Sequence, residues 1–120
     1  TPNNHEAEVA THIRIRSDED ARRAGHLFME RARCRSVLIT RGEHGMSLVD
    51  PTGDLHFPAV AREVADVTGA GDTVIAALAL SLAAGATLGE AAHLANHAAA
   101  IVVGRFGAAT VTPDELLATF

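Results

Sequence analysis

The chain has 120 residues, of which 48% are hydrophobic and 3% aromatic, and its formal net charge at pH 7 is −5. This composition supports one small packed core, and the acidic balance with no Trp or Tyr argues against nucleic-acid binding, which favours a basic face and stacking rings. All cationic residues are arginines, which excludes a Walker-type or Schiff-base lysine. The single cysteine, Cys34, cannot form an internal disulfide, so we expect a reducing, cytoplasmic setting. No apolar run reaches the length of a membrane span.

Two helices are expected at the start of the chain. Asn3 or Asn4 can cap a short helix that runs to about Thr11. Ser17 can cap a second helix, whose three first-turn acids suit the positive end of the helix dipole. The apolar positions of this helix follow helical spacing: Ala21, Ala24, Phe28 and Ala32.

Three strands and then three helices are expected along the rest of the chain. The strands cover 36–40, 46–50 and 55–60, with a loop at 41–45 and a turn at 51–54. The helices cover about 71–84, ended by Gly85; about 88–103, opened by a Thr87–Glu90 capping box; and a last turn with Pro113 at its first position. This order favours the closing half of an α/β sandwich.

The stretch "TGAGD" (68–72) permits three interpretations. Asp72 can be an ordinary first-turn acid, which is common. A dinucleotide fingerprint fails, because Val74 replaces the third glycine and Asp72 would face the pyrophosphate. In the third interpretation, the backbone N–H groups of 69–72 hold the charge of a phosphoryl group while Asp72 accepts a proton from an attacking hydroxyl.

The motif "DVTGAGD" (66–72) resembles the C-terminal signature of the PfkB/ribokinase family of carbohydrate kinases. Three other stretches resemble further motifs of that family, in the same order: "NNHE" (3–6), "TRGEHG" (40–45) and "LANHAAAIVVGRFGAATV" (94–111). The resemblance implies an α/β fold, the C-terminal portion of a ribokinase-like three-layer αβα sandwich. It also implies ATP- and Mg²⁺-dependent phosphoryl transfer to a sugar hydroxyl.

The resemblance also implies roles for individual residues. Asp72 is the catalytic base, beside an anion hole made by Gly69, Ala70 and Gly71. Asn3 and Glu6 help to hold Mg²⁺ and phosphate through water, and Asp66 and Thr68 border a site for a monovalent cation such as K⁺. The residues expected to bind the nucleotide are Thr40, Gly42, Gly45 and Asn96, the last of them near the adenine.

The resemblance covers residues 1–120 as the C-terminal nucleotide-binding and catalytic-base portion of a kinase domain. The chain opens on Thr1 without Met, so we expect a fragment in which the N-terminal half, with most sugar contacts, is absent. The closest likeness within the family is to kinases of ADP-heptose biosynthesis, which convert D-glycero-β-D-manno-heptose 7-phosphate to the 1,7-bisphosphate. Expected partners are ATP, a sugar or sugar phosphate, and a second copy bound through regions not present.

Several alternatives remain open at this stage. The chain can instead be a non-catalytic nucleotide-binding fragment that needs a partner half, or a kinase for another sugar; a nicotinamide-dependent oxidoreductase is supported by "GAG" alone. Asn3 and Glu6 can be an ordinary helix cap, and Gly42 and Gly45 a plain hairpin turn. His93 and His97 share a helix face as a zinc pair would, but Leu94 stands where an H-E-x-x-H motif has Glu.

Overall fold

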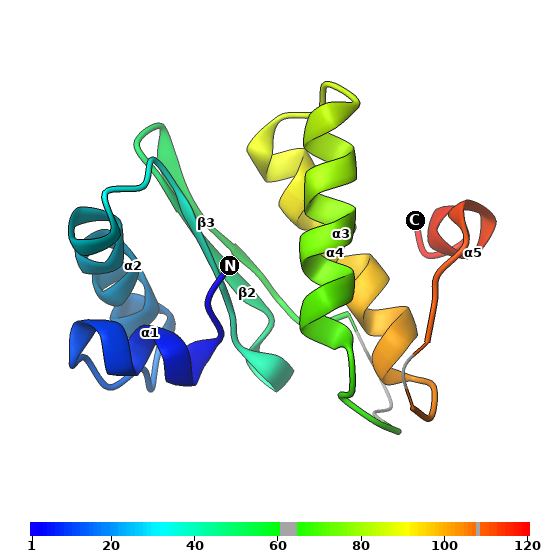
Figure 1. Ribbon diagram of the computed structural model, residues 1–120, viewed down its shortest axis with the longest axis horizontal. Helices are drawn as coiled ribbons and strands as arrows, with labels where there is room; N and C mark the ends of the chain where they lie inside the picture. The colour runs from blue at the N-terminus through cyan, green and yellow to red at the C-terminus, as the bar shows by residue number, and fades with distance from the viewer. Residues whose placement is uncertain (61–64, 108) are drawn as a thin grey trace. The chain divides into compact units, whose positions relative to one another are not determined.

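The computed structural model describes residues 1–60, 65–107 and 109–120, which form two compact units, Thr1–Pro58 and Ala59–Phe120 (Figure 1). Residues 61–64, which precede the glycine motif, and Ala108, within the 94–111 stretch, lie outside the described residues. The first unit contains α1 (Asn4–Thr11), α2 (Asp18–Ala32), β1 (Val37–Thr40), the 3₁₀ turn η1 (Gly42–His44), β2 (Met46–Asp50) and β3 (Gly53–Phe57). The second contains α3 (Ala70–Ala83), α4 (Leu88–Val103) and α5 (Pro113–Leu117), so the expected order of elements is confirmed.

The strands form an antiparallel sheet in the order β1-β2-β3. β3 differs from the expected 55–60 at both ends. It begins at Gly53, which has φ 147°. Because Gly53 pairs with Asp50, the turn that connects β2 to β3 contains two residues. It ends at Phe57, because Pro58 has no N–H to donate to a ladder.

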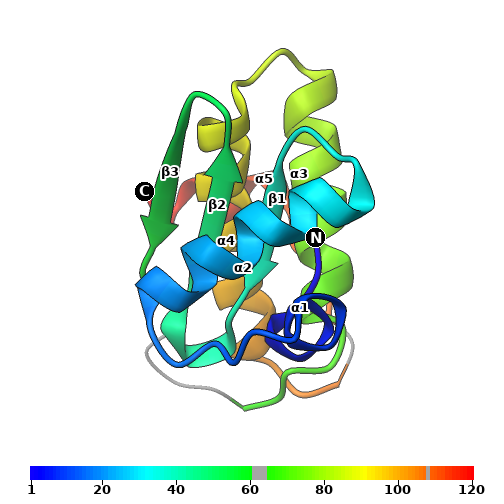
Figure 2. The ribbon, with the colours of Figure 1, turned by 90° about the vertical axis from the view of Figure 1, so that its left-hand side faces the viewer.

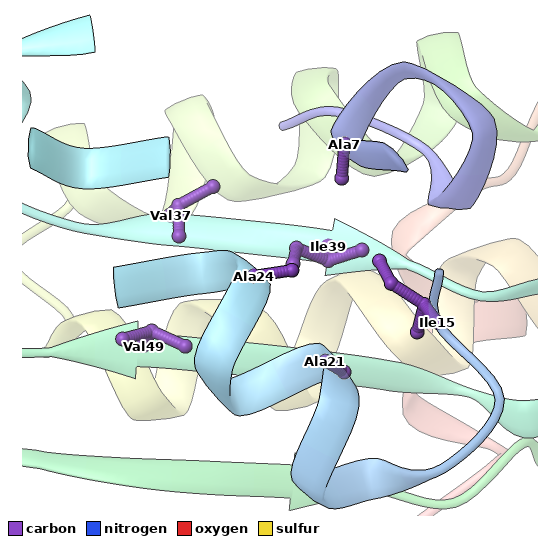
Figure 3. Close-up of a cluster of buried hydrophobic side chains, with 7 residues drawn as sticks. All are labelled: Ala7, Ile15, Ala21, Ala24, Val37, Ile39 and Val49. Atoms are coloured by element: carbon purple, nitrogen blue, oxygen red, sulfur yellow. The ribbon is translucent and has the colours of Figure 1, made fainter. Parts of the chain in front are cut away.

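Both helices of the first unit cover one face of this sheet, and α2 lies across the strands (Figure 2). The side chains between these layers form the core of the unit: Ala7, Ile15, Ala21, Ala24, Val37, Ile39 and Val49 (Figure 3). Ala32, expected on the same face, is exposed, because α2 ends there and Arg33 turns into a left-handed conformation with φ 52°. Gly25 is buried instead, and a Cβ at this position would lie 2.4 Å from Cγ2 of Val49.

The second unit is built on close contact between two Ala-rich helices. α3 packs against α4, which in turn packs against α5. The buried residues of α4 are mostly small, and include Ala91, Ala92, Ala95 and Ala98. Small side chains let the two helix backbones approach each other. None of the helices in the described part of the chain is both long and apolar enough to cross a bilayer.

Candidate functional site

The N-terminus of α3 has an unusual cap. Its N-cap residue, Gly69, has the left-handed angles φ 78° and ψ 0°, which glycine adopts without the steric cost of a Cβ. Gly69 has no side chain with which to accept a hydrogen bond. By contrast, α1, α4 and α5 have N-cap residues with polar side chains, namely Asn3, Thr87 and Thr112. Each of these side chains accepts a hydrogen bond from the N–H of the third residue of its helix.

In α3 the third helical residue is Asp72, so its N–H lacks the usual capping acceptor. Within the described residues, the N–H groups of Gly69, Gly71 and Asp72 have no hydrogen-bond acceptor. The N–H of Ala70 does have one, the carbonyl of Val67 at 3.2 Å. Three of the four amides expected in the anion hole are therefore open, and the fourth is engaged in a local turn.

The Asp72 carboxylate is exposed and forms no hydrogen bond or ion pair with the described residues. The acids at the same helical position in α4 and α5 are engaged in their own caps: Glu90 accepts from Oγ1 of Thr87 at 2.8 Å, and Glu115 from Oγ1 of Thr112 at 3.0 Å. An uncommitted carboxylate next to open amide donors can accept a proton while the amides stabilise negative charge on a neighbouring phosphoryl group.

Asp66 connects the segment before this turn to the loop after α4. Its Oδ1 accepts both the N–H of Thr68 at 2.9 Å and the hydroxyl of Thr68 at 2.6 Å, and its Oδ2 accepts the N–H of Gly107 at 3.0 Å. These hydrogen bonds, first of all the one from the Thr68 hydroxyl, lower the pKa of Asp66. The carbonyl of Val103 accepts the N–H groups of Ala65 and Asp66, at 2.7 and 3.2 Å.

This arrangement is compatible with the expected monovalent cation. The lowered pKa keeps Asp66 ionised, which supplies negative charge. The Thr68 hydroxyl donates its proton to Asp66, so its oxygen lone pairs can face a cation. Among the residues that the structure describes, no cluster of three or more His, Cys, Asp or Glu side chains could hold a metal ion.

Asn3 and Glu6 form a reciprocal capping box at the start of α1. Oδ1 of Asn3 accepts the N–H of Glu6 and Oε2 of Glu6 accepts the N–H of Asn3, both at 2.8 Å. The ordinary cap, one of the two interpretations of this motif, is therefore present. The second carboxylate oxygen of Glu6 is not used in the box, and both residues are exposed, so the water-mediated magnesium role is compatible with the cap and stays a prediction.

The 40–45 loop is a tight connection between β1 and β2. Gly42 and Gly45 have φ 56° and 80°, both in the left-handed region that favours glycine. The N–H of Arg41 donates to the carbonyl of Gly45 at 2.8 Å and closes the loop. Thr40 is paired with Asn3 through a parallel bridge, so the structure brings together two of the predicted site residues of the first unit.

The sequence patterns assign no role to Arg41, yet its side chain is the buried member of an ion pair. It is 2% exposed, and its Nη1 lies 2.5 Å from Oδ1 of Asp18. The only sequence signal for it is a charged residue placed directly after a buried strand, inside a glycine-rich loop.

Asn96 and His97 are buried on α4. Nδ1 of His97 lies 2.8 Å from Oγ of Thr119, and its ring stacks on Phe120 with the centroids 4.0 Å apart. The His93 ring contacts the His97 ring edge-on at 4.8 Å. Burial lowers the pKa of His97, and the neighbouring His93 lowers it further. The histidine pair thus packs against the C-terminal aromatic ring.

The family model described as pfkB family carbohydrate kinase matches residues 1–115. Bifunctional protein HldE of Geotalea uraniireducens is 50% identical over 119 residues, which cover 98% of this chain and 24% of that protein. The chain therefore spans about a quarter of the length of this relative.

Two solved ribokinases have the same fold as this chain. The ribokinase of Thermotoga maritima matches with a TM-score of 0.86 and 30% identity, over 98% of this chain and 40% of the ribokinase. The ribokinase of Arabidopsis thaliana, solved with ribose and ATP, matches with a TM-score of 0.86 and 26% identity, over 98% of this chain and 39% of that enzyme. The expected ribokinase-like α/β fold is confirmed.

Proposed function

Because this chain belongs to the pfkB family of carbohydrate kinases, we propose that it provides the nucleotide site and catalytic base of an enzyme that transfers the γ-phosphoryl group of ATP to a sugar hydroxyl. The observation that carries the proposal is the uncapped N-terminus of α3, where open amides lie next to the uncommitted carboxylate of Asp72. The Arabidopsis ribokinase, solved with ribose and ATP, supports ATP as the phosphoryl donor.

In this proposal Asp72 takes the proton of the acceptor hydroxyl as its oxygen forms a bond to the γ-phosphorus, and ADP leaves when the bond to the β-phosphate oxygen breaks. The open N–H groups of Gly69, Gly71 and Asp72 stabilise the charge that develops on the transferring group. Asn3 and Glu6 would hold Mg²⁺ through water molecules, and the bound ion would neutralise part of the phosphate charge. The remaining residues of the proposed site are Thr40, Gly42, Gly45 and Asn96 for the nucleotide, and Asp66 and Thr68 for K⁺.

The proposed acceptor is D-glycero-β-D-manno-heptose 7-phosphate, giving the 1,7-bisphosphate. The support is the resemblance of 1–6, 38–50 and 63–104 to the heptose 7-phosphate kinase part of ADP-heptose synthase, together with the likeness to HldE. Residues 1–120 would then be the C-terminal portion of the kinase domain, with most sugar contacts provided by other parts of the polypeptide. A cytoplasmic homo-oligomer completes the proposal.

A second candidate function is nucleotide binding without catalysis. In this case residues 1–120 bind nucleotide but phosphorylate a sugar only when they are part of a longer polypeptide. The observation that favours it is the coverage, because this chain matches 40% of a ribokinase. Measuring kinase activity for residues 1–120 and for the full-length protein separates the two candidates. Activity that is present only in the full-length protein supports the second candidate for residues 1–120.

The test of the proposed function is Mg²⁺- and ATP-dependent ADP release by the full chain, with heptose 7-phosphate, fructose 6-phosphate and ribose as acceptors. Asp72→Asn should lower kcat by about 10²–10⁴-fold, because the general base is lost, while the affinity for ATP changes little. The matched control is Asp114→Asn, which removes an exposed first-turn acid of α5 and should leave turnover unchanged. Turnover by Asp72→Asn close to that of the unsubstituted enzyme would refute the role of Asp72.

A further inference from the structure

The Arg41 side chain leaves the 40–45 loop and reaches the first residue of α2. Its backbone stands between Thr40 and Gly42, two residues of the proposed nucleotide loop, whereas its guanidinium is buried and contacts Asp18, 23 residues earlier in the chain. The Asp18 carboxylate is 63% exposed. The loop is therefore attached to the start of a helix through one long, buried side chain.

The Arg41 guanidinium has few other partners that could hold it in place. Nε of Arg41 is buried and has no hydrogen-bond partner within the described part of the chain, so the hydrogen bond from Nη1 to Asp18 orients the guanidinium. The second carboxylate oxygen of Asp18 lies 3.7 Å from Nε2 of His56, on β3. Asp18 thus lies between the loop and the sheet, and its own pKa is lowered, chiefly by the hydrogen bond from Arg41.

The loop backbone has its own geometric demands. Gly42 and Gly45 hold left-handed angles, and the 3₁₀ turn between them is closed by the carbonyls of Arg41 and Gly42, which accept hydrogen bonds from His44 and Gly45. These bonds lie within the loop and set its internal shape. They do not fix the loop relative to α2, whereas the Arg41–Asp18 pair does.

We infer that Arg41 is a positioning residue for the nucleotide: its ion pair with Asp18 anchors the 40–45 loop from behind, so that Thr40 and Gly42 meet ATP in one geometry. This inference rests on the proposed function, in which that loop binds the nucleotide. The Arg41 side chain reaches Asp18 at the start of α2, so it would affect the nucleotide only through the backbone of the neighbouring residues Thr40 and Gly42.

The test is a steady-state analysis of Arg41→Met in the full chain, with ATP and the sugar varied separately. Met keeps much of the length of the side chain and removes the ion pair. A misplaced loop should raise the KM for ATP by about tenfold and leave the KM for the sugar unchanged. A purely structural loss would lower the fraction of active enzyme, and thus the apparent kcat, without moving either KM.

Two further variants keep the inference testable if Arg41→Met does not fold. Asp18→Asn removes the charge from the exposed side of the same pair and should raise the KM for ATP in the same direction; combined with Arg41→Met it should add little, because both changes break one interaction. Arg41→Lys, which keeps the charge but not the planar fork, should restore part of the affinity for ATP. The matched control is Arg23→Met, because Arg23 is exposed and its ion pair with Asp20 lies within α2.

The outcomes separate this inference from the proposed function. If the unsubstituted enzyme phosphorylates a sugar with ATP and both Arg41→Met and Asp18→Asn keep its KM for ATP, the role of Arg41 is refuted and the proposed function stands. If the unsubstituted enzyme neither binds nor uses ATP, both are refuted together.

Discussion

Replacing Gly25 with Ala tests how closely α2 approaches the sheet. The new Cβ would lie 2.4 Å from Cγ2 of Val49, 3.1 Å from Cβ of the same residue and 3.4 Å from Cγ1 of Val37. Ordinary carbon–carbon contacts are about 3.5–4.0 Å, so the closest contact is about 1 Å too short. Val49 is 1% exposed and β-branched, so it has no free space into which to turn. The helix must therefore move away from the strands.

Two opposing terms decide the sign of the effect. Ala in place of Gly within a helix contributes about 1 kcal/mol of stability, whereas overpacking a core costs about 1–3 kcal/mol. Because a retreat of α2 also loosens the contacts of Ala21 and Ala24, we expect the larger cost to apply. The net result should be a free energy of unfolding lowered by about 1–2 kcal/mol.

Urea unfolding followed by circular dichroism measures this change. The control is Gly71→Ala, where a Cβ would meet nothing within 4 Å, and which should leave stability unchanged or slightly raised. In a double-mutant cycle with Val49→Ala, the two losses should be less than additive by about 1 kcal/mol, because the smaller residue makes room for the new methyl group. A Gly25→Ala protein as stable as the original would refute the close approach of α2.

Two further predictions concern α4. Thr87→Ala removes the capping hydroxyl and should lower the free energy of unfolding by about 1 kcal/mol, which would be measured as a lower Tm. The control is Thr110→Ala, because Thr110 is exposed and lies outside the helix caps. Equal Tm values for the two variants would contradict the stabilising role of the cap. The pKa of His97 is lowered in the folded protein, so the folded state favours the neutral ring. The stability that this preference contributes is complete at a pH above the ordinary pKa of histidine and is lost as the pH falls toward the lowered pKa. His97→Gln should therefore flatten the decline in stability that urea midpoints record below about pH 6.5, an effect that the exposed control His5→Gln should not reproduce.

The helices could be predicted well from the sequence because their ends are set by local chemistry. Ser17, Thr87 and Pro113 mark helix starts, and the structure begins α2, α4 and α5 at the expected positions. Such caps involve residues three positions apart, so they can be read from a short stretch. The "TGAGD" motif is equally local, which is why the residues alone predict its place at the start of α3.

Contacts between distant segments could not be predicted in this way. Arg41 meets Asp18 across 23 positions, and the Asp66 carboxylate reaches the N–H of Gly107 across 41. In the sequence Gly25 resembles an ordinary, slightly unfavourable helix residue, and its buried position depends on where β2 lies. In each case the partner is chosen by the fold and leaves no periodic pattern in the chain.

On the proposed function, the glycine at the start of α3 would link catalysis to folding. A helix without a capping side chain leaves donor groups to be satisfied by an arriving anion, and on the proposed function that anion belongs to the substrate. The nucleotide would then complete the secondary structure, so that occupancy and local order rise together. By mass action, a ligand at one hundred times its Kd adds about 2.7 kcal/mol to the stability of the state that binds it. Where α1, α4 and α5 are closed by their own side chains, α3 would be closed by the molecule on which the enzyme acts.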